Sequence, residues 1–201
     1  MPEPQDNLRR AEEMAFNSLG NQTSEQMLWL GAHSEGAVWR VAVLNDLLTL
    51  DLSARYVTTS AGREVGHVWR ILMLHYLAIA SRPEKLEPEV TFADLPTARS
   101  YARVYHQRVI SRLCATVGQD EQRFRTAADA LGGRIATGGN IAFDFEVFPR
   151  LCVRVIWHKS DEEFTPSATL LLPVNIESLF CIEDIVVLSE SLVSRLGGRA
   201  L

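Results

Sequence analysis

Cysteine is scarce in this sequence, and its cysteines lie far apart. Cys114, Cys152 and Cys181 form no C-x-x-C pair. A disulfide framework, a zinc site or an iron-sulphur site needs cysteines that recur at short, regular spacings. The residues therefore predict no disulfide scaffold and no metal site, and they name no cofactor. They favour three small hydrophobic side chains in the interior.

A basic excess and a long hydrophobic run are also missing. The formal net charge is -5, whereas proteins that bind nucleic acid usually carry a basic excess or a basic face. The longest apolar run, at 71–80, is much shorter than the roughly 20 residues that cross a bilayer. The stretch 1–13 has no apolar core of a signal peptide. We therefore expect a cytoplasmic protein with no nucleic-acid partner and no membrane segment.

The sequence contains no familiar catalytic motif. The glycine-bearing segment 131–140 has neither the lysine of a phosphate-binding loop nor a G-x-G-x-x-G that opens a helix. There is no G-x-S-x-G, no H-E-x-x-H and no cysteine and histidine nucleophile motif. The sequence alone therefore names no reaction.

Hydrophobic periodicity is clear, and it separates helices from strands. Apolar residues at helical spacing predict helices at 5–19, 24–32, 64–81, 97–117, 120–131 and 182–196. Alternation predicts a hairpin at 38–52 and strands at 141–148, 151–157 and 168–172. Helices and antiparallel hairpins in separate runs indicate an α+β fold. We expect one domain, 1–201, with the proline-rich segment 81–90 as the connector should there be two subdomains.

The hairpin at 38–52 has a residue pattern that suggests a register. A two-residue turn at Asn45 and Asp46 would place Trp39 opposite Leu52 and keep the apolar residues of both strands on one face.

The second hairpin joins the strands at 141–148 and 151–157. A two-residue loop would mismatch the faces of these strands, so we predict a three-residue loop, 149–151, that places Glu146 opposite Arg154.

An acidic loop at a strand end is the main candidate site. Asp161, Glu162 and Glu163 follow a strand that ends near Trp157, and Phe164 comes next. Loops at strand ends often carry binding residues. The structural alternative is a capping box, in which the serine at 160 and Glu163 close a short helical turn.

His75 is the second candidate, because it lies in the middle of the most apolar predicted helix. Histidine titrates near neutral pH, so His75 could act as a base, although a core histidine with one hydrogen bond is the more common case. His106 and His158 could approach His75 or Asp161, and the sequence does not say which of these side chains meet.

Two hypotheses follow. The first is an accessory or binding domain that holds a small ligand or a protein partner. The second is an acid/base or hydrolase-like enzyme that uses Asp161, Glu162 and His75. The candidate ligand-binding residues are His75, Trp157, Asp161, Glu162, Glu163 and Phe164.

Three segments, "ILMLHYLAIA", "AADALGGRIATGGNIAFDFEVFPRLCVRVIWHKSDEEFTPSA" and "IEDIVVLSE", resemble the family known as domain of unknown function 3786. The resemblance extends over about 36–190 and is most specific in 131–188. It implies a protein of anaerobic bacteria or archaea, and some relatives are described as iron-sulphur proteins with a four-cysteine segment in front. The sequence contains no such segment. Asn140 replaces an aspartate, and Leu172 with Pro173 replaces Phe-Asp, so an activity that needs those carboxylates would be affected.

Overall fold

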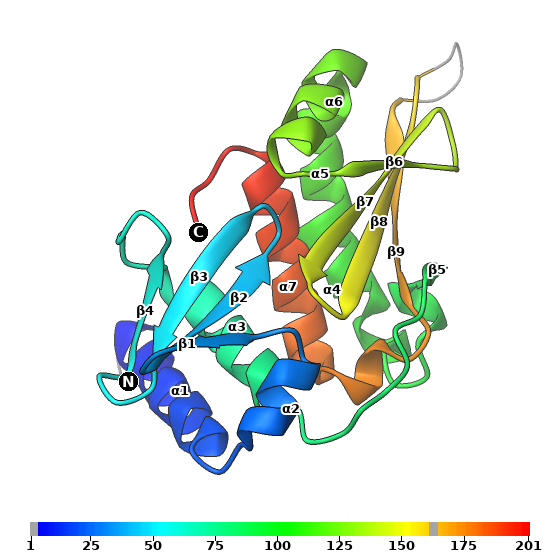
Figure 1. Cartoon of the computed structure of the whole chain (residues 1–201). Helices are drawn as coiled ribbons and strands as arrows, with labels where there is room; N and C mark the ends of the chain where they lie inside the picture. Colours follow the sequence, from blue (N-terminus) through cyan, green and yellow to red (C-terminus); the bar gives the residue numbers. More distant parts are fainter. Residues whose placement is uncertain (1–3, 161–164) are drawn as a thin grey trace. The chain divides into compact units, whose positions relative to one another are not determined.

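A computed structural model of the chain describes residues 4–160 and 165–201, which form helices and two antiparallel sheets (Figure 1). The α+β fold predicted from the sequence is confirmed. The chain divides into two compact units. Unit 1 contains Met1–Glu84, Phe148–Arg150 and Leu201, and unit 2 contains Lys85–Val147 and Leu151–Ala200. The first crossing between the units, after Glu84, falls within the segment 81–90.

Unit 1 combines a four-stranded sheet with three helices. The strand order is β1-β2-β3-β4. The elements are α1 (Pro4–Leu19), α2 (Ser24–Trp29), β1 (His33–Glu35), β2 (Val38–Val43), β3 (Asp46–Asp51), β4 (Tyr56–Thr59) and α3 (His67–Leu77).

Helix α3 supplies the centre of the unit 1 core. Tyr76 is fully buried and stacks on Phe148, with ring centroids 4.4 Å apart. Its hydroxyl donates to the carbonyl oxygen of Leu30 at 2.6 Å and accepts from the backbone N–H of Arg150 at 3.1 Å. Because a buried phenol needs partners for its hydroxyl, these two bonds explain why residues 148–150 belong to this core.

The predicted register of the first hairpin is wrong by two residues. Trp39 pairs with Leu50 rather than Leu52, and the turn consists of Leu44 and Asn45. Leu44 has a φ of 55°, a conformation that costs a non-glycine residue energy. A shift of two residues leaves every side chain on the same face, so the apolar pattern could not exclude it.

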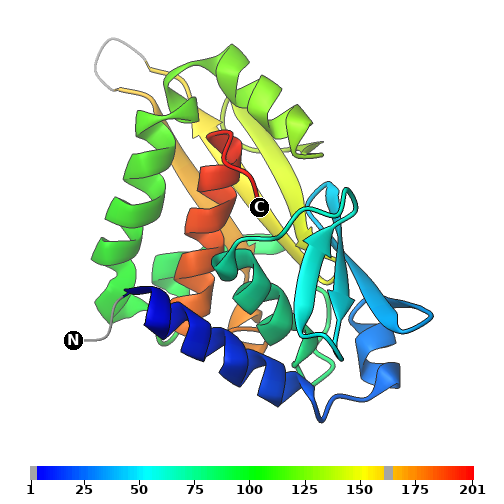
Figure 2. The ribbon, with the colours of Figure 1, turned by 90° about the vertical axis from the view of Figure 1, so that its left-hand side faces the viewer.

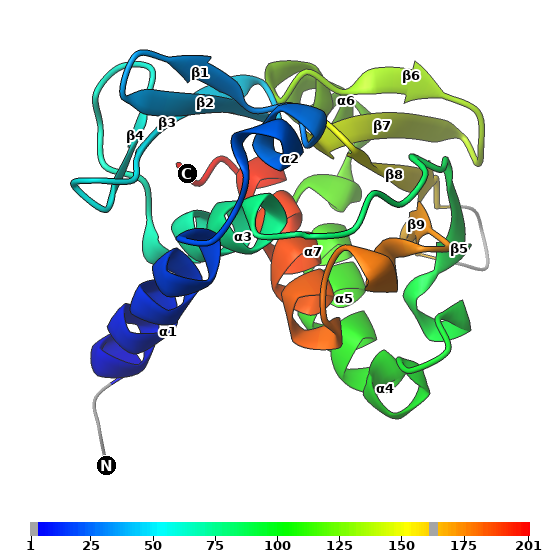
Figure 3. The same ribbon diagram turned by 60° about the horizontal axis from the view of Figure 1, so that its bottom comes forward.

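Unit 2 contains a five-stranded sheet and the remaining helices. The strand order is β5-β9-β8-β7-β6. The elements are β5 (Pro88–Thr91), α4 (Ala102–Tyr105), α5 (Ser111–Ala115), α6 (Glu121–Ala130), β6 (Arg134–Ala136), β7 (Ile141–Phe148), β8 (Leu151–His158), β9 (Ser167–Pro173) and α7 (Ile182–Leu196). Figure 3 shows this sheet with α7 and the run from α4 to α5 on the same side of it.

The second hairpin also differs from its prediction. Two residues, not three, separate β7 from β8. Arg154 forms a bidentate ion pair with Asp144, at 2.6 and 2.9 Å, instead of pairing with Glu146. The prediction assumed that one face of each strand is solvated. Ala142 and Cys152 are buried, however, so alternation does not determine this register.

A π-helical segment, His106–Ile110, interrupts the long helix predicted at 97–117. The segment lies between α4 and α5, and Figure 2 shows the whole run beside α7. The predicted stripe is buried at Tyr105, Val109 and Leu113. In an α-helix, each residue of a stripe with i, i+4 spacing is rotated by about 40° around the helix axis from the one before it. A π turn contains more residues and reduces this rotation, so the π segment keeps the stripe on one face of the helix.

Candidate ligand pocket

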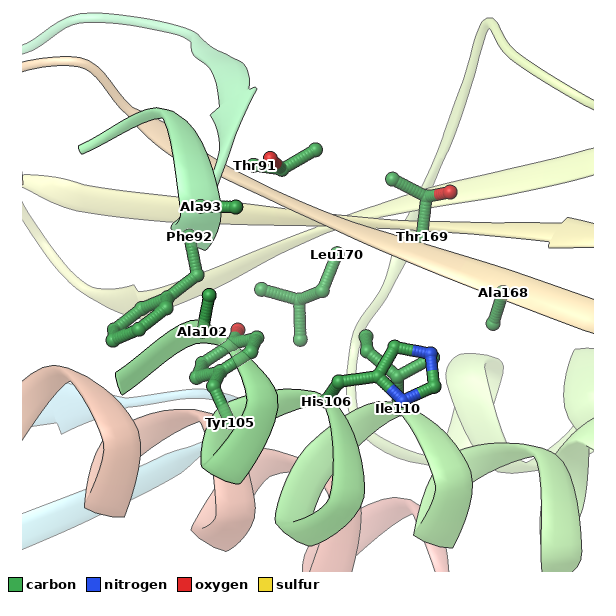
Figure 4. Close-up of a pocket in the computed structure, with 10 residues that line it drawn as sticks. All are labelled: Thr91, Phe92, Ala93, Ala102, Tyr105, His106, Ile110, Ala168, Thr169 and Leu170. Carbon is green, nitrogen blue, oxygen red and sulfur yellow. The ribbon is translucent and has the colours of Figure 1, made fainter. Parts of the chain in front are cut away.

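A pocket of about 240 Å³ lies in unit 2, between β9 and the run formed by α4 and the π segment. Figure 4 shows its walls, which come from the end of β5 and the turn after it, from the helical run and from β9. Most of the lining side chains are apolar. The lining residues are Thr91, Phe92, Ala93, Ala102, Tyr105, His106, Ile110, Ala168, Thr169 and Leu170.

Two stacked rings form one end of the pocket. Phe92 and Tyr105 have ring centroids 4.0 Å apart and are nearly parallel (Figure 4). The Tyr105 hydroxyl donates to Ser189 Oγ at 3.1 Å, and Ser189 donates to the carbonyl oxygen of Ile185 in α7. Burial raises the pKa of the Tyr105 phenol far above its ordinary value, and the bond to Ser189 opposes this shift. Tyr105 is therefore an apolar wall and not an acid or base.

The π segment places a histidine at the other end. His106 and Ile110 begin and end this segment, and Figure 4 shows both side chains on the helical side of the pocket. His106 is exposed, and its Nδ1 has only a long contact of 3.5 Å with Ser111 Oγ. Single π turns within helices occur frequently at functional sites. His106 is thus the lining side chain best able to bind a polar group.

The two threonines of the lining contribute less. The Thr91 hydroxyl donates to Asp94 Oδ2 at 2.6 Å in a capping box, which lowers the pKa of the Asp94 carboxyl. Figure 4 shows Thr169 pointing to the opposite side of β9 from Ala168 and Leu170, as alternation along a strand requires. The inner surface of the pocket is therefore apolar, with His106 at its edge.

The edge of β9 at the pocket is partly open. β5 pairs with β9 only at Pro173, Leu172 and Leu171. On this side, positions 167–170 have no partner among the strands that the structure describes. The Cys114 thiol takes one backbone hydrogen bond from Ala168, and burial raises the pKa of this thiol. The other backbone groups of this open edge can bind a ligand.

The residues predicted as a site lie in different settings. Trp157 is 3% exposed, and its indole N–H donates to the carbonyl oxygen of Gly118 at 2.7 Å in unit 2. His75 is half-buried in α3 of unit 1 and interacts with other parts of the protein. Asp161, Glu162, Glu163 and Phe164 lie outside the described residues.

Asn140, where the resemblance led us to expect an aspartate, has a structural contact. Its side-chain oxygen accepts from the backbone N–H of Lys159 at 2.8 Å, and the backbone N–H of Asn140 donates to the carbonyl oxygen of Trp157. An aspartate oxygen could accept the same hydrogen bond. The asparagine therefore holds the ends of the two strands together as an aspartate would, but it adds no negative charge.

The pocket could not be read from the sequence. Its lining comes from three segments, and small residues such as Ala102 and Ala168 create its space rather than any motif. His106 was one of several histidines, and no local pattern announces a π segment. The one available signal was the i, i+4 spacing of the stripe, which fits a wide turn.

Two further kinds of feature are absent from the residues that the structure describes. No group of three or more histidine, cysteine, aspartate or glutamate side chains is placed to hold a metal ion. None of the described helices is long and apolar enough to cross a membrane.

Comparison with known proteins places the chain in a family. Neither the curated proteins nor the solved structures contain a match. A sequence model of one family matches 25–195, which includes every residue of the pocket and excludes α1. The chain therefore belongs to the family described as Domain of unknown function (DUF3786).

Proposed function

We propose that this chain is a small-molecule-binding domain whose ligand occupies the pocket between β9 and the α4–π run. The observation that carries this proposal is a concave apolar space with an exposed histidine placed at its edge by a π segment. Pockets with an apolar lining and a few polar groups are the usual sites for small ligands. Ala168 of the pocket pairs with Trp157, so the site is close to the strand end identified from the sequence.

The pocket also limits the ligand. Its volume of about 240 Å³ is below the 300–1,000 Å³ that is typical for drug-sized ligands, so the ligand is small. Phe92, Tyr105 and Leu170 favour an apolar or aromatic body. His106 and the open edge of β9 favour one group that forms hydrogen bonds, such as an amide or a carboxylate.

Binding fits this pocket better than acid/base catalysis does. No carboxylate is among the ten lining residues, and the only other titratable side chain, Tyr105, is committed to Ser189. An acid/base pair needs two such groups within reach of one substrate. We place the protein in the cytoplasm, where free thiols such as the exposed Cys181 stay reduced.

Pocket filling tests the proposal. The probes are indole, benzamide and benzoate, and the measurement is the shift of backbone amide signals on titration. In the wild type we expect the probes to shift the backbone amide signals of His106, Ala168 and Leu170. In Ala102→Leu, whose larger side chain fills the pocket, these shifts should be lost. Ala115→Leu is the matched control, because Ala115 is exposed on α5 and does not line the pocket. Equal binding by wild type and Ala102→Leu would refute the proposal.

A further inference from the structure

A second cavity, of about 520 Å³, lies within unit 1 and has a polar lining. Its charged centre consists of Glu12, Glu64, His67 and Arg70, which we call the acid-base cluster. The rim is completed by Arg9, Glu13, Phe16 and Arg55. This cavity shares no residue with the pocket in unit 2.

A carboxylate and an imidazole are in direct contact in the acid-base cluster. Glu12 Oε2 lies 2.7 Å from His67 Nδ1. The Glu12 side chain is 13% exposed, whereas that of His67 is 38% exposed. The carboxylate is therefore held inside while the ring remains accessible from the cavity. This is the arrangement in which a buried carboxylate orients a histidine base.

Arg70 forms an ion pair with each carboxylate of the cluster. Its side chain is 8% exposed, and its Nη1 lies 3.0 Å from Glu64 Oε1. Its Nε lies 3.4 Å from Glu12 Oε1. A buried guanidinium is stable only beside such partners. Arg70 therefore supplies Glu12 with a counter-charge next to the imidazole.

The position of one proton decides what His67 can do. Nδ1 faces an acceptor, Glu12, at 2.7 Å and a donor, Arg70 Nη2, at 2.9 Å, and it can satisfy only one of them. The contact with Glu12 is the shorter of the two, which favours a proton on Nδ1 and a bond to the Glu12 carboxylate. Arg70 Nη2 then keeps its longer approach of 3.5 Å to Nε2. Nε2 retains its lone pair.

We propose that Glu12 and His67 form a general acid–base pair that hydrolyses small esters carrying a carboxylate. His67 is the catalytic residue, and Glu12 is a positioning residue. The anionic substrate follows from Arg9, which lines the cavity, whereas Arg55 donates to Asn17 Oδ1 and lies over the Phe16 ring.

The reaction balances without a cofactor. His67 Nε2 takes a proton from water, and the resulting hydroxide forms a bond to the carbonyl carbon of the ester. The bond from this carbon to the leaving oxygen breaks, and the imidazolium returns its proton to that oxygen. Glu12 accepts the Nδ1–H bond throughout and does not itself give up or take a proton.

The tautomer of His67 is the first test, and it needs no activity. Long-range ¹⁵N–¹H spectra of the wild-type protein, with the His67 signal assigned from His67→Gln, distinguish a proton on Nδ1 from one on Nε2. We expect the Nδ1–H form in the neutral ring, and its loss in Glu12→Gln. A neutral ring protonated on Nε2 in the wild-type protein would overturn the proposal.

Hydrolysis of 4-acetoxybenzoate is the second test, with its methyl ester as the neutral analogue. We expect the wild type to prefer the carboxylate, His67→Gln to lose this activity, and Glu12→Gln to lower kcat at least about tenfold with little change in KM. Glu12→Asp should recover part of the rate. The matched control is His33→Gln, because His33 is an exposed histidine of β1 outside the cavity.

The two tests leave no neutral outcome. Equal rates of hydrolysis by the wild type and His67→Gln would overturn the proposed acid–base pair. The absence of hydrolysis by both proteins counts as equal rates. A preference for the methyl ester would overturn the substrate class. Melting temperatures of the variants show whether a lost rate reflects unfolding, and in that event the tautomer in the wild-type protein decides.

Discussion

At the scale of single residues, Arg70 shows how one buried charge determines its surroundings. Two carboxylates accompany its guanidinium, and both are acids that the apolar pattern of α3 does not reveal. We expect Arg70→Met to lower the free energy of unfolding by about 3–5 kcal/mol, because it leaves those carboxylates without a counter-charge. Urea unfolding measures this loss. Arg103→Met, at an exposed position of α4, should change the stability by less than about 0.5 kcal/mol.

Cys152 gives a prediction about alkaline pH. Burial raises the pKa of its thiol to about 11, with the Asp144 charge adding to the shift. An unfolded thiol ionises near about 8.5. At a pH between these two values the thiol is protonated in the folded state and ionised in the unfolded state. The contribution of Cys152 to the free energy of unfolding is therefore complete below pH about 8.5 and is lost as the pH rises towards 11.

The comparison of two unfolding curves isolates this effect. Between pH 7.5 and 9.5, urea unfolding should show a smaller loss of stability in Cys152→Ala than in the wild type. Cys114 and Cys181, whose pKa values burial also raises, are present in both proteins and contribute equally. An identical pH dependence in the two proteins would show that Cys152 ionises as readily when folded as when unfolded.

At the scale of elements, the start of α6 offers a clear test of local structure. The Asp120 side chain accepts the backbone N–H of Arg123 at 2.8 Å and thereby caps the helix. Asp120→Ala should cost about 0.5–2 kcal/mol of stability. Asp129→Ala, in the last turn of the same helix, should be neutral or slightly stabilising, because an acid is unfavourable at that end. Thermal unfolding of the two variants checks the difference.

Long periodic elements were predictable, whereas registers and the π segment were not. The bounds of β7 and α7 agree with the predicted 141–148 and 182–196, because many residues contribute to each pattern. The register of β2 against β3 escaped prediction, since a shift of two residues preserves both faces. One extra residue in a helical turn leaves the composition unchanged, so the i, i+4 spacing of the buried stripe was the one signal for the segment that carries His106.

The candidate sites were harder to predict than the elements. The sequence pointed to Asp161 and Glu162 with His75, and these two acids lie outside the described residues. The structure joins another carboxylate and imidazole, those of Glu12 and His67, which are 55 positions apart. Such pairs depend on how helices pack, and no local spacing encodes them. The strand that ends near Trp157 pairs with β9, which lines the pocket.

At the scale of the whole molecule, the chain crosses between its two units more than once. Residues 148–150 join unit 1 although the strands on either side of them belong mainly to unit 2. Phe148 is fully buried against Tyr76. We expect Phe148→Ala to remove about 3–5 kcal/mol of protection from the amides of α3, as measured by hydrogen exchange. A loss confined to unit 2 would contradict the assignment of these residues to the unit 1 core.

The family match covers the two cavities to different extents. The matched region, 25–195, contains the whole pocket of unit 2. It contains His67 and Arg70 but not Glu12, which lies on α1. All residues of the pocket therefore lie within the matched range, whereas Glu12 lies on a helix outside it.

A crystal structure of the protein soaked with indole or benzamide is the most direct test of the small-molecule pocket. We expect electron density for the compound in the space between Leu170 and the stacked rings of Phe92 and Tyr105, with its polar group near His106. An empty pocket in crystals that bind the compound elsewhere would contradict it.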